Sequence, residues 1–446
     1  MPSLAARRIF PRFHLLSWAW VAAMALMVVA GVYAQGSSAG KVAAPTLSQR
    51  PLVWPGIDVL QARGFDLLRG KRVGLLTNPA GVNRNGESTI DVLRQAKGVN
   101  LVALYGPEHG IYGDEKADTP IPDRVDARTG LPVFSLYGKY RKPTPEMLRG
   151  IDVMVVDLQD IGTRSYTYIS CLRLVMEACF AQDKEVIVLD RPNPLGGLKV
   201  GGPMMEERWM SYVGEYKVPY VYGLTIGELA RMAKDNVGWL DVPDDVRQRG
   251  VLLVVPMHGW HRSMLWPDTG LKWVPTSPGI INVPAAFGYG LTGLGGQLGK
   301  FSHGFGTPYP FRLLNYPGKT PEALAVTMKA LHLPGLDFRP LHYKDAAGTD
   351  RSGAYVVVTD WNAVDPTELS FYMMKLAAAW DPAGNPFAEA KASDADLFNK
   401  HVGSTAWWEE ITKKGARADV AGFFRIWDTE DAKYQQWSRR WWLYPV

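Results

Sequence analysis

From Gly56 onward, short apolar runs alternate with helix-length amphipathic segments, and this alternation constrains the fold more than any other feature. The runs are rich in Val, Ile and Leu and lie at 72–77, 100–105, 152–157, 185–189 and 251–255. The helical segments between them lie at 88–96, 166–181 and 225–235. Strands that alternate with helices are typical of βαβ units, and continuous apolar strands suit a sheet covered on both faces. The sequence therefore predicts an α/β fold with a doubly wound parallel sheet.

The chain changes character after this region. Up to about Tyr316 it is rich in Gly, Pro and aromatic residues, and we expect irregular structure that closes over the strand ends. A second alternation follows, with a helix expected at 321–331, a strand at 354–359 and a helix at 368–379. We therefore predict a sheet domain at 51–315 and a smaller C-terminal α+β domain at 316–446.

The first 34 residues have the pattern of an export signal. Three arginines, Arg7, Arg8 and Arg12, precede an apolar run at 15–32, and Ala34 ends a plausible cleavage site. The paired arginines also fit a twin-arginine route, and 35–50 is a small, polar stretch typical of a flexible linker. We expect an exported protein, periplasmic or extracellular, with no membrane contact after cleavage. The alternative is an uncleaved membrane anchor, since the run is long enough to span a bilayer.

The net charge gives no reason to expect a nucleic-acid partner. The full chain carries a formal charge of +5, and removing three arginines with the leader leaves 5 − 3 = +2. The two cysteines, Cys171 and Cys179, are eight residues apart in one predicted helix, about 12 Å at 1.5 Å per residue. A disulfide needs Cα atoms within about 7 Å, so we expect free buried thiols.

Polar side chains follow almost every predicted strand, at the point where it ends. In an open α/β sheet, ligands bind outside the carboxyl ends of the strands. The Pro and Gly residues beside these side chains stiffen the loops, as a preorganised site requires. The candidate site residues are Asn78, Glu108, His109, Asp157, Asp160, Arg164, Tyr166, Asp190, Arg191 and Asn193.

Glu108, in the rigid sequence Gly-Pro-Glu-His-Gly, is the main catalytic candidate. A carboxyl that is partly shielded from water has a raised pKa and can protonate a leaving oxygen, and His109 is placed to orient it. The alternative is a carboxylate that anchors the loop by accepting backbone N–H bonds.

Asp157, Asp160 and Asp190 follow the next two strands and could converge with Glu108 on one cleft, because adjacent strands are about 5 Å apart. Glycoside hydrolysis commonly uses such a pair of carboxyls. The alternative for Asp190 and its neighbour Arg191 is a structural ion pair that fixes the turn.

Other side chains suit a sugar substrate. Arg164 and Arg191 could fork onto a substrate carboxylate, and Tyr166 could stack on a sugar face. We expect no metal, because His258 and His261 lack the glutamate of a zinc motif, and no organic cofactor, because the glycine pattern at 288–293 does not follow a first strand.

Six ordered motifs resemble a known family. They are GLLTNPAGV (74–82), LYGPEHGIYG (104–113), TGLPVFSLYG (129–138), DLQDIGTRSYTYI (157–169), LDRPNPLGG (189–197) and YGLTIGELA (222–230). Together they look like the bacterial exo-β-N-acetylmuramidase family (NamZ-like). The resemblance runs from about Gly56 to the C-terminus. It implies a Rossmann-like catalytic domain, a C-terminal auxiliary domain, and release of N-acetylmuramic acid from the non-reducing end of peptidoglycan-derived saccharides. It also implies that Glu108 is catalytic.

One segment departs from the family pattern. Where a motif like EGTNxSEGRGT is usual, this chain reads QLGKFSHGFGT at 297–307. Gln297 and His303 replace two glutamates, and Phe305 replaces an arginine. His303 is a candidate substrate contact. If the missing arginine holds the lactyl carboxylate of muramic acid, the lost contact is worth about 1.5–3 kcal/mol, and we expect a change in either the affinity or the choice of substrate.

These observations favour an exported glycoside hydrolase of cell-wall amino sugars, with Glu108 as general acid. One of Asp157, Asp160 or Asp190 would be the base or nucleophile, or would stabilise an oxocarbenium-like charge. The alternative is a glycan-binding protein that has lost activity through the altered segment at 297–305. A hydrolase of another bond ranks last, because the chain lacks a serine elbow and a metal motif.

Overall fold

The computed structural model describes residues 53–113 and 122–446. The predicted signal at 1–34 and linker at 35–50 therefore lie outside the described residues. No helix within the described ranges is both long and apolar enough to cross a bilayer.

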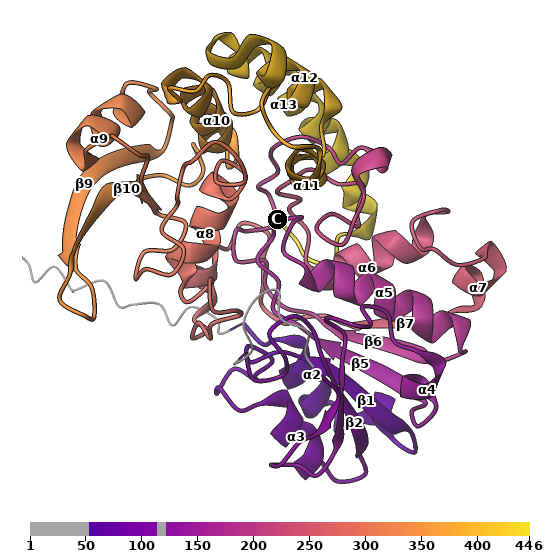
Figure 1. The fold of residues 1–446 in the computed structure, drawn as a ribbon. Coiled ribbons are helices and arrows are strands. Elements are labelled where there is room, and N and C mark those ends of the chain that lie inside the picture. The colour runs from indigo at the N-terminus through magenta and orange to yellow at the C-terminus, as the bar shows by residue number, and fades with distance from the viewer. Residues whose placement is uncertain (1–52, 114–121) are drawn as a thin grey trace, which may run out of the picture. The chain divides into compact units, whose positions relative to one another are not determined.

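A seven-stranded sheet dominates the N-terminal part of the chain (Figure 1). Its strand order is β3-β4-β2-β1-β5-β6-β7, and all neighbours are parallel except β3 and β4. The strands are β1 (Arg72–Thr77), β2 (Asn100–Gly106), β3 (Arg124–Val125), β4 (Pro132–Ser135), β5 (Val153–Asp157), β6 (Glu185–Leu189) and β7 (Leu252–Val255). The predicted parallel α/β sheet is confirmed. The short strands β3 and β4 add an edge that the apolar pattern did not reveal.

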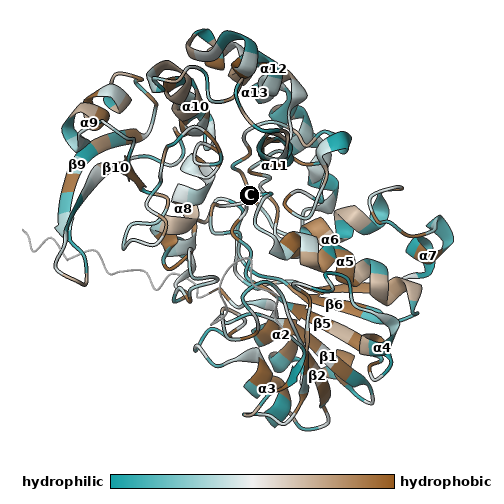
Figure 2. Ribbon diagram, viewed as in Figure 1, coloured by the Kyte–Doolittle hydropathy of each residue, from teal (hydrophilic) through white to brown (hydrophobic). Residues whose placement is uncertain are grey.

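Helices cover both faces of this sheet, as Figure 1 shows. In β5, Val153 and Val155 pack into one core cluster with α2 (Gly56–Ala62) and α3 (Thr89–Gln95). The alternate residues Met154 and Val156 pack into another with the two helices on the opposite face. Those helices are α5 (Tyr168–Ala181) and α6 (Ile226–Asp235). Both faces of β5 are buried, which explains its continuous apolar sequence and its hydrophobic colouring in Figure 2.

The helices between the strands begin where local signals place them. The Ser88 hydroxyl accepts the Ile90 N–H at the start of α3. Thr225 and Glu228 form a capping box at the start of α6. Two short helices, α4 (Pro145–Leu148) and α7 (Asp244–Arg249), complete this part. Cys171 and Cys179 are free and buried, as expected.

The stretch that we expected to be irregular contains a helix. Its residues 283–292 form α8 (Val283–Thr292), which starts at the Asn282 cap with Pro284 in its first turn. The several glycines of this segment concealed it, because glycine lowers helix propensity. Gly288 is needed here, since a Cβ there would meet the Phe311 carbonyl at 2.6 Å.

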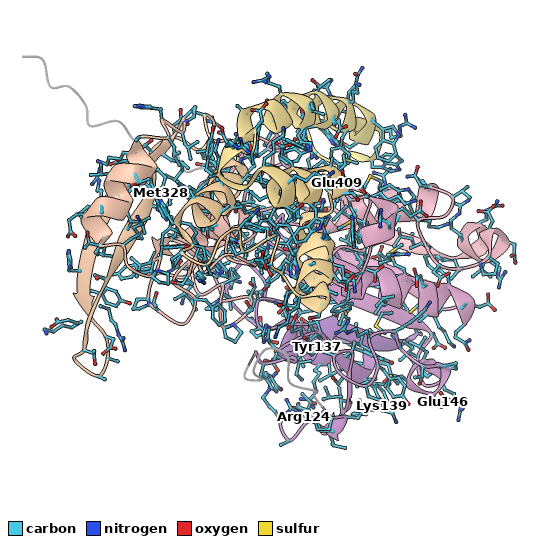
Figure 3. All side chains as sticks on the ribbon, turned by 45° about the horizontal axis from the view of Figure 1, so that its top comes forward. Arg124, Tyr137, Lys139, Glu146, Met328 and Glu409 are labelled. Carbon is cyan, nitrogen blue, oxygen red and sulfur yellow. The ribbon has the colours of Figure 1, made fainter. Side chains whose placement is uncertain are left out.

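A three-stranded antiparallel sheet of order β8-β10-β9 follows. Its strands are β8 (Leu313–Leu314), β9 (Leu336–Lys344) and β10 (Asp350–Val358), and α9 (Pro321–Lys329) packs on it. Met328 of α9, labelled in Figure 3, is buried in the same core cluster as Phe338 and Val356. This small sheet with its helices confirms the predicted C-terminal α+β part.

The C-terminal helices form an aromatic core and return to the large sheet. They are α10 (Glu368–Trp380), α11 (Ala392–Val402), α12 (Thr405–Lys414) and α13 (Val420–Ser438). Phe371, Trp407 and Trp427 pack together in this core. The chain end reaches the sheet, where the Tyr444 hydroxyl donates to Asp190. Most of the aromatic side chains near the C-terminus therefore pack inside the protein.

Candidate active site

A cavity of about 530 Å³ opens beside the carboxyl ends of β2 and β5, and we name it the Glu108 cavity. Cavities of this size suit small-molecule ligands, and a sugar unit fits within it. Its lining is rich in aromatic rings, with several hydroxyls and one carboxylate. The lining residues are Glu108, His109, Ser165, Tyr166, Thr167, Tyr168, Ser277, Pro278, Gly279, Ile280, Tyr289, Phe305 and Phe311.

Glu108 is half-buried in this lining, two residues after β2. Its Oε2 accepts a hydrogen bond from the Thr167 hydroxyl at 2.8 Å, which fixes the carboxylate from the start of α5. His109 is buried beside it with a φ of 69°, a left-handed conformation that is uncommon outside glycine. It lies within a tight turn in which Gly110 donates to the Pro107 carbonyl at 2.9 Å. Strained backbone of this kind clusters at functional sites.

Tyrosines and small hydroxyl side chains form one part of the lining, which we name the tyrosine wall. The rest, which we name the apolar rim, consists mainly of Pro278, Gly279, Ile280, Phe305 and Phe311. The Ser165 hydroxyl is 2.8 Å from the Tyr220 hydroxyl and 3.1 Å from that of Tyr289. The Tyr166 hydroxyl lies 2.7 Å from the Thr276 hydroxyl, and its ring contacts Tyr289 edge-on at 6.1 Å. Burial raises the pKa of Tyr289 to about 12, so these phenols stay neutral and act as hydrogen-bonding surfaces at neutral pH.

Asp160 lies behind this wall and is not one of the lining residues. It is buried, and it accepts hydrogen bonds from the Tyr222 hydroxyl and from the Gly162 N–H at 2.7 Å. Its second oxygen, Oδ1, has no partner among the described residues. Burial raises the pKa of Asp160 to about 6. Burial is the main reason that the pKa of Tyr166 and the pKa of Tyr289 are raised, and the charge of Asp160 adds to both shifts.

We expect this raised pKa to make the stability contribution of Asp160 depend on pH. Because the folded-state pKa of about 6 exceeds the ordinary value of 3.8, the folded protein binds the proton more tightly than the unfolded chain. The contribution of Asp160 is therefore largest below about pH 4, falls as the pH rises to about 6, and is flat above about 7. Melting temperatures of the wild type and Asp160→Asn, measured from pH 4 to 8, should differ by an amount that changes only in that window. A difference that is constant with pH would contradict the prediction.

Asp157 and Arg191 pair with each other inside the protein. Arg191 Nε donates to Asp157 Oδ1 at 2.5 Å and Nη2 to Oδ2 at 2.9 Å, and both side chains are almost fully buried. The Thr89 hydroxyl also donates to Asp157, and Arg191 Nη2 donates to the Val82 carbonyl at 2.7 Å. The bidentate pair thus joins the ends of β5 and β6 to the loop after β1. Neither residue lines the Glu108 cavity.

Asp190 anchors the start of α6. It accepts hydrogen bonds from the Thr225 hydroxyl at 2.7 Å, the Gly227 N–H at 2.8 Å and the Tyr444 hydroxyl. Burial raises its pKa to about 6. It has no exposed surface and does not line the cavity. The alternative of an ion pair between Asp190 and Arg191 is not seen either. The Arg191 guanidinium pairs with Asp157, and only the backbone N–H of Arg191 donates to Asp190, at 3.0 Å.

Arg164 and Asn193 were also predicted to contact the substrate, but their side chains form hydrogen bonds with backbone groups instead. Arg164 is fully buried, and its guanidinium donates to the carbonyls of Pro203, Val218, His401 and Val402 at 2.7–3.1 Å. Burial lowers its pKa to about 10. Asn193 donates to the Leu224 carbonyl and accepts the Leu195 N–H, both at 3.0 Å. These two side chains brace the sheet domain, and Arg164 joins it to α11.

Asn78 and His303 lie near the cavity without lining it. Asn78 is buried and donates to the Thr276 carbonyl at 3.4 Å. The His303 ring stacks on Phe311 with centroids 4.7 Å apart, and burial lowers its pKa to about 4. His303 is therefore neutral at neutral pH and supports a lining aromatic ring.

The structure brings Glu108, His109 and Tyr166 together at one cavity, with Asp160 close behind. The sequence analysis did not identify the lining residues between 277 and 289, including Ser277, Ile280 and Tyr289. Tyr289 lies on α8, in the segment that we expected to be irregular. The Asn282-Val-Pro start of that helix was the signal that could have revealed it. Among residues 53–113 and 122–446, no group of three or more His, Cys, Asp or Glu is arranged to hold a metal ion.

Two family models match most of the chain. Residues 73–284 match the family model described as exo-beta-N-acetylmuramidase NamZ, N-terminal. Residues 287–444 match the corresponding C-terminal model.

Individual relatives give the same result. The chain is 40% identical over 332 residues to the peptidoglycan beta-N-acetylmuramidase NamZ of Bacillus subtilis (strain 168), covering 74% of this chain and 78% of that protein. A crystal structure of a DUF1343 family protein from Bacteroides fragilis NCTC 9343 is 43% identical with a TM-score of 0.78, covering 88% of this chain and 99% of that one. A second such protein from that organism, 23% identical with a TM-score of 0.65, covers the same shares and shows the same fold. This chain therefore belongs to the exo-beta-N-acetylmuramidase NamZ family.

Proposed function

We propose that this protein is an exo-β-N-acetylmuramidase that removes N-acetylmuramic acid from the non-reducing end of peptidoglycan fragments, with Glu108 as the general acid. The observation that carries the proposal is the position of Glu108, which is the one carboxylate among the described lining residues of a sugar-sized, aromatic cavity. Membership of the family favours a hydrolase over a protein that only binds glycan.

The proposed chemistry needs a proton at the glycosidic oxygen. Glu108 donates that proton as the bond between the sugar C1 and the oxygen breaks, and the leaving saccharide departs with a free hydroxyl. A water molecule adds its oxygen to C1 and releases a proton to the solvent, and the Glu108 carboxylate takes up a proton from the solvent before the next turnover. The Thr167 hydroxyl, 2.8 Å from Glu108, holds the carboxyl in position. The tyrosine wall and the apolar rim exclude bulk water from the reacting atoms.

Asp160 is the proposed second carboxyl. It lies in the same loop between β5 and α5 as Ser165 and Tyr166, which line the cavity. Its negative charge can therefore stabilise the oxocarbenium-like positive charge that develops at C1. Asp190 is less suited to this role, because its carboxylate has no exposed surface and is held by α6 and the chain terminus.

The proposal is tested with paired substrates. The purified protein is incubated with a chromogenic N-acetylmuramide and with the matching N-acetylglucosaminide, which lacks the lactyl ether. We expect release from the muramide at a rate well above that from the glucosaminide. Saturable binding of the muramide without release would show a glycan-binding protein and contradict the proposal.

Phe305 at the cavity rim is expected to contribute to sugar binding. Its ring is 60% exposed, contacts Phe311 edge-on at 6.2 Å and lies over Gly279. Loss of an aromatic contact is worth about 0.5–1.5 kcal/mol, or roughly 2–12-fold in affinity. We expect Phe305→Ala to raise KM by about that factor, with kcat and melting temperature nearly unchanged. The matched control is Ile426→Ala, which removes an exposed apolar side chain outside the cavity. An unchanged KM in Phe305→Ala would contradict a binding role.

We also propose that the protein is exported, since a peptidoglycan substrate lies outside the cytoplasm. The support is the arginine-containing apolar leader at 1–34. Mass spectrometry of the protein from its native cells should find a mature chain that starts after Ala34. A chain with an intact leader in the cytoplasmic fraction would contradict export.

A further inference from the structure

A second cavity of about 210 Å³ lies at the same edge of the large sheet, and we name it the switch-point cavity. Val82 and Asn83, after β1, line one side, and Gln159, after β5, lines the other. Strands β1 and β5 are neighbours, and the chain leaves this pair in opposite directions, to β2 on one side and to β6 on the other. Ligands of open α/β sheets bind at this point of the topology. The proposed hydrolytic site uses the Glu108 cavity and leaves this one without a function.

The lining of this cavity is cationic. It contains Arg84, Arg191 and Lys272, and no Asp or Glu among the residues that the structure describes. Arg191 is 3% exposed, and its Nε and Nη2 are used by Asp157 and Val82. Its Nη1 makes no hydrogen bond with any described residue, although the rest of the guanidinium is fully engaged.

The other two cations are also incompletely neutralised. The Arg84 guanidinium stacks on Trp54 at 3.9 Å and faces Asp58 at 3.5 Å, a distance that is long for a charged hydrogen bond. Lys272 is exposed, and within residues 53–113 and 122–446 it has no ion-pair or hydrogen-bond partner. Three donors of positive charge therefore meet in one small, partly enclosed space.

Two further polar atoms on lining residues lack partners. Trp266 is 5% exposed and Gln159 is 1% exposed, and both line the cavity. The Trp266 Nε1–H and the Gln159 Oε1 are buried with no hydrogen-bond partner among the described residues. Buried polar groups are nearly always paired. The Trp266 N–H lacks an acceptor, which an anion can supply, whereas the Gln159 oxygen lacks a donor, such as a water molecule.

Thr276 separates the two cavities. Its carbonyl accepts hydrogen bonds from the Tyr168 hydroxyl at 2.6 Å and from Asn78 at 3.4 Å, and its hydroxyl contacts Tyr166. The segment around it lines the switch-point cavity with Lys272 and Val274, and the Glu108 cavity with Ser277. The switch-point cavity is therefore a distinct site in the wall next to the hydrolytic one.

We infer that the switch-point cavity binds an oxyanion, either a carboxylate or a phosphate group, through Arg191 Nη1, Arg84 and Lys272. The Trp266 Nε1–H is a further donor to the same group. Guanidinium and ammonium groups that converge on a partly dry site bind such groups strongly. The oxyanion is either a free small anion or a carboxylate carried by the glycan substrate.

The test measures inorganic phosphate binding by calorimetry at constant ionic strength, so that general screening does not change. We expect saturable binding that weakens by about tenfold or more in Lys272→Glu, which replaces an attractive charge with a repulsive one. Trp266→Phe, which removes the N–H with the five-membered ring of the indole and keeps a six-membered aromatic ring, should weaken it by about threefold. The matched control is Lys97→Glu. Lys97 is exposed and precedes β2, at the amino ends of the strands, whereas the switch-point cavity lies at their carboxyl ends. This control should leave the phosphate dissociation constant unchanged.

A second arm identifies the source of the oxyanion, using a muramoyl glycan fragment and the Glu108→Gln background to prevent hydrolysis. If Lys272→Glu also weakens the fragment, the bound group is a carboxylate of the substrate. If it weakens phosphate alone, the cavity binds a free anion. The inference is overturned if Lys272→Glu and Lys97→Glu have equal dissociation constants for both ligands. The phosphate arm needs no turnover, so its outcome is independent of the proposed hydrolysis.

Discussion

Glu108→Gln is expected to lower release of N-acetylmuramic acid by about 10²–10⁴-fold, the range that general-acid catalysis supplies. Glutamine cannot donate a carboxyl proton, but its amide oxygen can still accept the Thr167 hydrogen bond seen at 2.8 Å. The fold and the melting temperature should therefore stay near those of the wild type. The control is Glu389→Gln, at an exposed glutamate outside the cavity, which should keep full activity.

The dependence on the leaving group separates acid catalysis from simple positioning. A dinitrophenyl muramide has a leaving group that departs without a proton, so Glu108→Gln should slow its hydrolysis far less than that of a natural glycan. An equal loss on both substrates would mean that Glu108 only positions the sugar. Turnover of the glycan near the wild-type rate would contradict any catalytic role for this residue.

Arg191→Leu is expected to destabilise the protein by about 3–5 kcal/mol, because it leaves the Asp157 carboxylate buried without its charged partner. Both side chains are almost fully buried, and the pair is bidentate at 2.5 and 2.9 Å. The change also removes the donor to the Val82 carbonyl, which holds the loop after β1. Urea denaturation of the wild type and the variant measures the loss.

A double-mutant cycle shows whether the pair or the packing carries the loss. We expect Asp157→Leu with Arg191→Leu to be less destabilised than the sum of the single changes, because no unpaired charge remains. The control is Arg249→Leu, which breaks the exposed pair with Asp183 at 3.1 Å and should have a much smaller effect. Additive single losses would contradict the expected coupling, and so would an Arg191→Leu variant that is as stable as the wild type.

Much of the fold follows from local patterns. The expected strands 72–77 and 185–189 coincide with β1 and β6, and the helix expected at 225–235 coincides with α6 to within one residue. A strand buried on both faces has to be apolar throughout, and a helix start needs a capping side chain, so both leave marks within a few residues. Helix α8 has such a mark in its Asn282 cap, but its glycines weaken the helical pattern. The short strands β3 and β4 have too few residues to show an apolar pattern.

Sequence alone located the polar strand ends and ranked Glu108 first among them, because a carboxylate in a stiff Gly-Pro turn after a strand is unusual whatever surrounds it. It did not determine which of these side chains face a cavity. That choice depends on partners far along the chain: Tyr444 bonds to Asp190, Val402 accepts from Arg164, and Arg191 pairs with Asp157. The Coulomb and hydrogen-bond energies of such contacts exist only once the chain has folded, so only the tertiary structure distinguishes a structural carboxylate from an accessible one.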